Sequence, residues 1–245
     1  MTHYELGEET RTKLMRISTA SIATALFKRG LRNQFIQGVV PVSRKPQNMV
    51  GQAFTLRYIP AREDRNQITV FRNEDHPQRQ AIEQCPAGHV LVMDSRQDAR
   101  AASAGSILIT RLQVRGAAGV VTDGGFRDAE GIGALDMPAY HARPSAPTNL
   151  TLHEALDINV PIGCGGAPVF PGDVIVGDGD GVIVIPAHLA DEIATECAGM
   201  EDFETFVLES VEAGHSIIGL YPPTRRETEE RFAKWLNERS RPSGD

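Results

Sequence analysis

Apolar residues recur at helical spacing in the first part of the chain and predict helix between residues 5 and 29. The repeating positions are Leu14, Ile17, Ile22, Leu26 and Phe27. Ser18, Thr19 or Ser21 could cap a second helix inside this stretch, because a hydroxyl at a helix N-cap accepts a hydrogen bond from the backbone. Gly30 then ends the helical pattern.

Short β-rich runs bounded by Gly, Pro and Asp follow. They cover residues 50–58, 90–93, 119–122, 158–161, 174–176 and 182–185. Helical spacing returns over residues 78–85, 106–115, 187–211 and 228–238. The second of these helices has its expected apolar face at Ile107, Leu108, Leu112 and Val114, with Gly116 closing it. The last helix is amphipathic around Phe232 and Trp235.

The middle of the chain alternates strand, helix and strand, which predicts a βαβ unit with two parallel strands. Ligands of such sheets gather beyond the carboxyl ends of the strands. The loops at residues 94–105 and 123–128 are therefore the expected ligand-binding loops. Since no Ser/Pro/Gly-rich linker divides the sequence, we expect a single domain of the α/β class over residues 1–245.

Composition excludes some classes of function but does not identify one. The 245 residues are 41% hydrophobic and carry a formal net charge of −7, with no basic stripe, so we expect no nucleic-acid partner. No apolar run is long enough to span a bilayer and no signal-peptide pattern is present, so we expect a cytoplasmic protein with no membrane partner. The three cysteines form no CxxC pair, and the seven histidines form no pair with metal-ligand spacing.

The loop at residues 123–128, DGGFRD, carries the first candidate chemistry. Two glycines allow a tight turn after a hydrophobic strand, and a cation and an anion follow side by side. Arg127 offers a planar fork for a carboxylate, and Asp128 offers a hard oxygen ligand for Mg²⁺ or Mn²⁺. The alternative is a solvated Arg–Asp pair that caps the next turn.

The start of the helix after Gly105 is the second candidate. Free N–H groups and the positive end of the helix dipole make such a start a seat for a carboxylate. The residues concerned are Gly105, Ser106, Ile107 and Leu108. Every helix has such an end, so Ser106 could equally be an ordinary cap or first-turn residue.

Residues 105–128, GSILITRLQVRGAAGVVTDGGFRD, resemble the signature of the RraA-like family, in which a glycine opens a helix and an Arg-Asp pair follows the next strand. Flanking matches are the Met-Pro at residues 137–138, VPIGCGG at 160–166 and PGDVIVGDGDGVIVIP at 171–186. This family contains class II pyruvate aldolases, which also decarboxylate oxaloacetate, and the non-enzymatic regulator of RNase E. The resemblance implies a swivelling α/β/β/α domain with its core at about residues 15–220 and a C-terminal helical arm at about 221–245.

The resemblance also implies roles for individual residues. Arg127 would bind the substrate's C1 carboxylate, Asp128 would ligate Mg²⁺ or Mn²⁺, and the backbone of residues 105–108 would hold the rest of the pyruvyl unit. A carboxylate from a neighbouring subunit, best matched by Glu204 with Glu201 close behind, would lie near metal-bound water. The implied protein is a divalent-metal-dependent lyase acting on a small 2-oxo acid, assembled as a homotrimer or a dimer of trimers.

Two positions depart from the family pattern. Ser106 stands where the aldolases have an acidic residue after the glycine, and Gly131 stands where they have Glu or Asp, with Glu130 beside it. A dehydratase of a keto sugar acid, or a non-catalytic regulator of ribonuclease activity, therefore remains an alternative. Residues 140–149 include Tyr140, His141 and Arg143, which could suit a more polar substrate or form only a rigid surface loop.

Overall fold

The computed structural model describes residues 4–239, so the ends of the expected 1–245 domain, residues 1–3 and 240–245, lie outside the described residues. The chain forms two compact units, residues 1–194 and 195–245. The boundary lies within helix α6 (Ala190–Glu212), whereas the resemblance placed the start of the C-terminal arm near residue 221. Each unit is described separately below.

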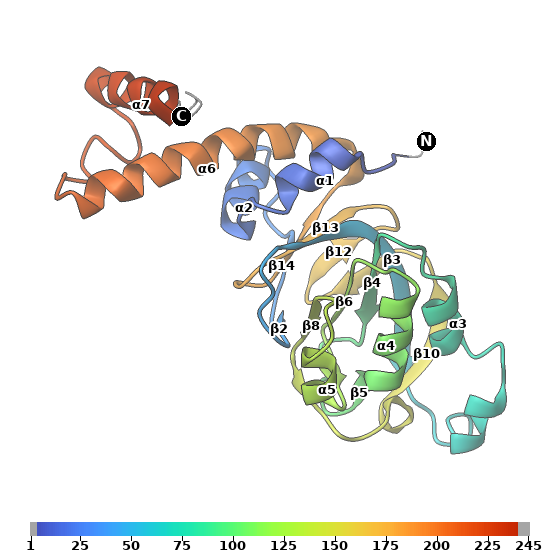
Figure 1. The fold of residues 1–245 in the computed structure, drawn as a ribbon. Coiled ribbons are helices and arrows are strands. Elements are labelled where there is room, and N and C mark those ends of the chain that lie inside the picture. Colours follow the sequence, from blue (N-terminus) through green and yellow to red (C-terminus); the bar gives the residue numbers. More distant parts are fainter. Residues whose placement is uncertain (1–3, 240–245) are drawn as a thin grey trace. The chain divides into compact units, whose positions relative to one another are not determined.

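The first unit is built on a nine-stranded sheet within the described part of residues 1–194 (Figure 1). Its order along the sheet is β1 (Phe35–Ile36), β14 (Val182–Ile185), β13 (Val174–Gly177), β3 (Met49–Pro60), β4 (His89–Asp94), β6 (Gly119–Thr122), β8 (Ala139–His141) and β2 (Val40–Pro41). Strand β10 (His153–Ile158) pairs with β3 outside this order. Strands β3, β4, β6 and β8 are parallel neighbours, which confirms the βαβ core and the α/β class.

Alternate residues of β4 pack into two different cores, as the twofold repeat of a strand requires. Leu91 and Met93 join the core beneath α3 (Pro77–Gln84), α4 (Ser106–Val114) and α5 (Ala129–Gly133). Val90 and Val92 join the core that includes the hairpin of β11 (Ile162–Cys164) and β12 (Ala167–Val169). Both faces of the parallel strands are therefore covered, which explains why their sequences are continuous apolar runs.

The N-terminal helices form as the pattern predicted, as α1 (Glu8–Leu14) and α2 (Thr19–Lys28). The side chain of Ser18 accepts a hydrogen bond from the backbone N–H of Ser21 at 3.1 Å, so Ser18 is the cap of the second helix. Gly30 has a positive φ of 81°, which a glycine adopts without strain and which ends the helix.

Two sequence predictions are wrong in detail. Residues 158–161 are not a strand: Ile158 ends β10, Asn159 has a φ of 56°, and Pro161 lacks the N–H that a strand interior needs. In α4 the buried residues are Ile109 and Leu112, whereas Ile107 and Val114 are 84% and 69% exposed. Residues 107 and 114 are seven apart and share a helix side, and residues 109 and 112 face the sheet instead.

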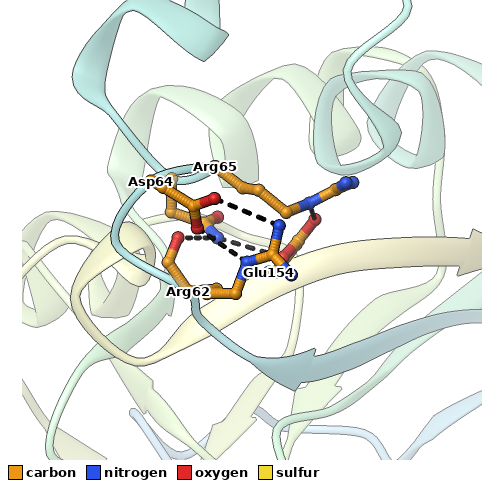
Figure 2. A network of polar contacts seen from close by, with 5 residues as sticks. Arg62, Asp64, Arg65 and Glu154 are labelled. Atoms are coloured by element: carbon orange, nitrogen blue, oxygen red, sulfur yellow. Dashed lines mark hydrogen bonds and ion pairs between the residues drawn. The ribbon is translucent and has the colours of Figure 1, made fainter.

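The connection between β3 and α3 contains the short helix η1 (Ile68–Arg72) and is tied to strand β10 by polar contacts. Figure 2 shows this network, in which Arg65 Nε lies 3.0 Å from Glu154 Oε1 and Asn66 Nδ2 donates to Glu154 Oε2 at 3.1 Å. Arg62 Nε donates to Asp64 Oδ1 at 2.6 Å in the same turn. These contacts hold the connection in place beside the sheet.

The second unit contains the remainder of α6 and α7 (Arg226–Arg239). Its core consists of Phe206, Val207 and Leu220, with Phe203, Phe232 and Trp235 packed against them. This packing confirms the predicted amphipathic helix around Phe232 and Trp235. No helix among the described residues is both long enough and apolar enough to cross a membrane.

Candidate active site

The two candidate segments meet because each follows a short strand of a second, smaller sheet. Strand β5 (Ala102–Ala104) pairs in parallel with β7 (Gly125–Phe126), which pairs in parallel with β9 (Arg143–Pro144). Gly105 therefore leaves the carboxyl end of one strand, and Arg127 leaves the carboxyl end of its neighbour. The Arg127 N–H donates to the carbonyl of Ala104 at 3.1 Å and fixes the register of the two segments.

Position 105 needs a glycine because the Arg127 and Asp128 side chains lie very close to it, and not because of its backbone conformation. Its φ of −129° and ψ of 176° are ordinary extended values. A Cβ at this position would lie 2.7 Å from Arg127 Cγ and 3.1 Å from Asp128 Oδ2. The missing side chain thus makes the space in which Arg127 and Asp128 lie against the start of α4.

Asp128 adopts the left-handed conformation, with φ 57° and ψ 38°, which aspartate tolerates better than most residues. It occupies the N-cap position of α5 but makes no side-chain cap hydrogen bond. Its Oδ2 instead accepts from Ser106 Oγ at 3.2 Å and lies 3.9 Å from Arg127 Nε. The carboxylate is thus directed to the start of α4 and does not cap the next turn, whereas the Arg127–Asp128 pair is half exposed, as the alternative of a solvated pair predicted.

The start of α4 forms one wall of a pocket of about 300 Å³. Gly105, Ile107 and Leu108 line this pocket together with Arg127 and Asp128, so the structure brings together the sites expected from both loops. Ser106 does not line it, but its hydroxyl contacts the Asp128 carboxylate. At the start of α4 the Ser106 N–H donates to Asp128 Oδ2 at 3.4 Å and the Leu108 N–H donates to the Gly105 carbonyl at 3.1 Å. Within the described residues, the Ile107 N–H is therefore the donor that this first turn leaves to an anionic ligand.

Three further polar or aromatic residues of the pocket were not among the site residues that the sequence predicted. They are Phe71 of η1 and Gln78 and Arg79 of α3. Gln78 is buried, and its Nε2 donates to the carbonyl of Ser103 at 2.6 Å, which attaches the start of α3 to β5. No short motif marks these residues, because only the packing of α3 on α4 brings them to the pocket.

The stretch at residues 140–149 reaches the pocket through its last two residues, Thr148 and Asn149. His141 and Arg143 do not line it. His141 is buried against Phe126 with ring centroids 5.7 Å apart, and Arg143 Nε donates to the carbonyl of Ala99 at 3.3 Å. The suggestion that these two residues serve the substrate is therefore not supported, since strands β8 and β9 direct them elsewhere.

A buried carboxylate behind the pocket holds the two ligand-binding loops. Asp123 accepts from the backbone N–H groups of Ser95 at 2.6 Å, and of Gln97 and Gly165 at 3.0 Å each. Burial raises the pKa of Asp123, and the three hydrogen bonds act against that shift. Gly124 is needed beside it, because a Cβ there would lie 2.6 Å from Ser103 Oγ. This packing fixes the path from β6 to Arg127.

Glu204, expected to serve the site of a neighbouring subunit, lies in α6 within the second unit, as does Glu201. Tyr221 Oη donates to Glu204 Oε1 at 3.1 Å, and this hydrogen bond raises the pKa of Tyr221. The contribution of Glu204 to a site in another copy of the chain stays a prediction.

The oxygen ligands around Asp128 fit Mg²⁺, which keeps several waters, and do not form a site in which protein side chains alone surround a metal ion. No group of three or more His, Cys, Asp or Glu among residues 4–239 could hold a metal ion. Mg²⁺ commonly takes one or two carboxylates and leaves the other positions to water and substrate. The Asp128 side chain is half exposed at the pocket, and its Oδ1 has no hydrogen-bond partner within the described residues, so one oxygen is available for such an ion.

The fold and site together define an α/β protein with a pocket, lined by Arg79, Arg127 and Asp128, at the carboxyl ends of parallel strands. The RraA-like family model, described as Aldolase/RraA, matches residues 19–184. The chain belongs to the RraA-like family.

Individual relatives agree with this assignment. The chain is 34% identical over 175 residues to a Halalkalibacterium halodurans protein that carries the provisional name 4-hydroxy-4-methyl-2-oxoglutarate aldolase; the match covers 71% of this chain and 75% of the relative. The structure of Streptomyces coelicolor RraAS2, described as an unusual member of the RNase ES inhibitor RraA family, matches with a TM-score of 0.72 and 27% identity over 82% of this chain and 96% of that one. A Pseudomonas syringae structure with a TM-score of 0.77 and 22% identity, covering 90% and 96%, shares the fold.

Proposed function

We propose that the protein is a divalent-metal-dependent lyase that cleaves a small 2-oxo acid in the pocket between α4 and the Arg127-Asp128 loop. The observation that carries this proposal is the placement around one pocket of a guanidinium, a helix N-terminus and a carboxylate oxygen that has no hydrogen-bond partner in residues 4–239. The name of the Halalkalibacterium halodurans relative supports the reaction class.

Each residue has a distinct part in the proposed reaction. Arg127 binds the C1 carboxylate through its planar fork, and the first turn of α4 binds the adjoining oxygens. Asp128 would hold a divalent cation, which would supply Lewis-acid stabilisation of negative charge on the 2-oxo group. Ser106 Oγ, 3.2 Å from Asp128 Oδ2, orients that carboxylate.

In the proposed aldol cleavage, the bonds that break and form in the substrate account for all of its atoms and electrons. The C4 hydroxyl loses its proton and becomes a carbonyl, the C3–C4 bond breaks, and its electron pair forms an enolate that is protonated at C3 to give pyruvate. We assign the acceptance of the hydroxyl proton to a carboxylate from a neighbouring copy, for which Glu204 is the candidate. In decarboxylation of oxaloacetate, the same enolate forms with loss of CO₂.

The test is Mg²⁺-dependent pyruvate release from a panel of 4-hydroxy-2-oxo acids and oxaloacetate, compared between the parent protein and Asp128→Ala. We expect the variant to lose metal-stimulated release and to keep its fold, because Asp128 is half exposed. Asp136→Ala is the matched control, since Asp136 is exposed and does not line the pocket. Equal metal stimulation of Asp128→Ala and the parent contradicts the proposal.

A second candidate is inhibition of a ribonuclease, supported by the description of the Streptomyces coelicolor relative. An experiment can distinguish the lyase function from ribonuclease inhibition. A regulator would bind the ribonuclease equally well after Asp128→Ala, because the contact surface and not the pocket would carry binding.

A further inference from the structure

A strained turn directly follows strand β4, in the loop that leads to β5 and Gly105. Arg96 and Gln97 have φ values of 61° and 57°, a left-handed conformation that residues with long side chains rarely adopt. Neither residue lines the pocket. Two such residues in succession cost free energy that the surrounding contacts must offset, and strain of this kind is concentrated at functional sites.

Carboxylates bind three successive N–H groups of this turn. Asp123 accepts from the N–H groups of Ser95 at 2.6 Å and Gln97 at 3.0 Å. Asp94 Oδ1 accepts from the N–H of Arg96, between them, at 2.9 Å. Hydrogen bonds to a charged acceptor are stronger than neutral ones. These bonds stabilise the left-handed turn and attach it to Asp123, from which the chain continues into β7.

The side chain of Arg96 joins the same turn to another wall of the pocket. Its Nη2 donates to the carbonyl of Leu152 at 2.8 Å and lies 3.1 Å from His153 Nδ1. Leu152 directly follows the short helix η2, whose first residue, Asn149, lines the pocket. Arg96 therefore connects the turn after β4 to the segment that carries Asn149.

His153 is suited to accept this hydrogen bond. It is fully buried, and burial followed by the charge of Arg96 lowers its pKa, so the ring is neutral at neutral pH. Arginine can only donate, so Nδ1 is the acceptor and the ring hydrogen lies on Nε2. The ring also packs beside Tyr58, with centroids 5.7 Å apart, and Tyr58 Oη donates to the carbonyl of Ser103 at 2.8 Å. The acceptor for Arg96 is therefore itself attached to β5.

We propose that Arg96 is a positioning residue of the site, which holds the wall that carries Asn149 at a fixed distance from the loop that carries Arg127. The inference rests on the proposed function, in which a substrate bound by Arg127 fills the space between the two. The strained turn, its carboxylate-bound N–H groups and the guanidinium contact together support it. Arg96 does not line the pocket, so it acts through other residues and takes no part in the bond changes.

Arg96→Met tests the inference by removing the guanidinium while keeping an unbranched side chain in the turn. We expect kcat/KM for pyruvate release to fall about 10- to 100-fold, because a displacement of about 1 Å at a positioning contact costs up to roughly 100-fold in rate. Mg²⁺ binding, measured by titration calorimetry, should not change, since the Asp128 carboxylate is held by contacts with Ser106 and Arg127.

Arg100→Met is the matched control in the same loop. Arg100 is exposed, and among residues 4–239 its side chain hydrogen-bonds to Asp98 alone, with Nη2 to Oδ2 at 2.7 Å. Both substitutions remove one positive charge from residues 94–105, so a general electrostatic effect would appear in both variants. We expect Arg100→Met to have the kcat/KM of the parent protein.

Two further variants separate positioning from a general effect on stability. Arg96→Gly removes the same contact but adopts the left-handed conformation without strain, so its Tm should exceed that of Arg96→Met. Its kcat/KM should nevertheless be as low. Arg96→Lys keeps the charge and loses the planar fork, so its kcat/KM should lie between those of the parent and Arg96→Met.

Hydrogen exchange measured by mass spectrometry reports the contact without catalysis. Exchange at residues 148–153 should be faster in Arg96→Met than in the parent and unchanged in Arg100→Met, because Arg96 binds Leu152 and His153 and Arg100 does not. This measurement does not depend on the reaction that the protein catalyses.

Several results overturn the inference. Activity that follows Tm, with Arg96→Gly more active than Arg96→Met, means that Arg96 acts through stability alone. An unchanged kcat/KM in Arg96→Met, or the same loss in Arg100→Met, also removes Arg96 as a positioning residue. If the parent releases no pyruvate, the lyase proposal fails. Faster exchange at residues 148–153 in Arg96→Met alone then leaves the positioning role standing, and unchanged exchange overturns it as well.

Discussion

Replacing Gly105 by alanine perturbs the candidate site while leaving the backbone where it is. The glycine has an extended φ of −129°, so alanine fits the local conformation. The added Cβ would lie 2.7 Å from Arg127 Cγ and 3.0 Å from Arg127 Cδ. Both atoms belong to the middle of the side chain, so the whole Arg127 side chain must move and cannot simply turn its tip away.

The size of the effect follows from this overlap. Carbon atoms in contact prefer a separation of about 3.5–4.0 Å, so Arg127 must shift by about 1 Å. A shift of that size at a group that positions the substrate costs up to roughly 100-fold in rate, equivalent to about 2.7 kcal/mol of transition-state stabilisation. Unfolding free energy should fall by about 1 kcal/mol, since alanine is a poorer N-cap than glycine and the site is crowded.

The assay is kcat/KM for Mg²⁺-dependent pyruvate release, with thermal unfolding measured by circular dichroism on the same samples. Gly131→Ala is the matched control in the same region. A Cβ at Gly131 meets only Ser106 Cβ at 3.7 Å, which is an ordinary contact. We expect Gly105→Ala to lose activity and Gly131→Ala to retain it, with both proteins folded at room temperature.

Retention of parental kcat/KM in Gly105→Ala would refute the reasoning, because the Arg127 position would then not matter to the reaction. Loss of activity accompanied by general unfolding would also contradict it, since the argument assigns the effect to two side chains. Equal activity loss in both glycine variants would show that any added side chain at these helix starts lowers activity, whether or not its Cβ overlaps Arg127.

Two further predictions concern the buried groups behind the site. Asp123→Asn should lower the unfolding free energy by about 3 kcal/mol in chemical denaturation, because an amide cannot accept from the N–H groups of Ser95, Gln97 and Gly165 together; an unchanged midpoint argues against a structural role for this carboxylate. Burial lowers the pKa of His141, so the folded state binds fewer protons than the unfolded state and stability falls as pH drops below about 6.5. His141→Leu should show a smaller decrease in Tm between about pH 7.5 and about pH 5.5 than the parent, and an identical decrease excludes His141 as a cause.

Local rules were sufficient for much of the secondary structure. The predicted run 182–185 is strand β14 to the residue, and the run 119–122 is β6. Ser18 caps α2 because a hydroxyl before a helical pattern has a backbone N–H within reach whatever the rest of the fold does. The Gly105 to Asp128 signature also located the pocket, since both of its ends follow strands that point the same way.

Other features needed contacts between distant segments. Which face of α4 is buried depended on the sheet beneath it, and Ile109 rather than Ile107 faces that sheet. The short strands β5 and β7 could not be recognised from their own residues, because two or three residues carry no periodicity and become a strand only by pairing.

The sequence by itself determined the parallel core, the helix starts and one end of the candidate site, because those features depend on residues close together in the chain. Only the tertiary structure decided the rest of the pocket lining. Arg79 and Asn149 are 70 residues apart in the numbering and come to one pocket because α3 packs against α4 and the turn Asn149–Thr151 packs against β5. No local pattern encodes that approach, since the free energy that brings them together comes from the buried core beneath all three elements.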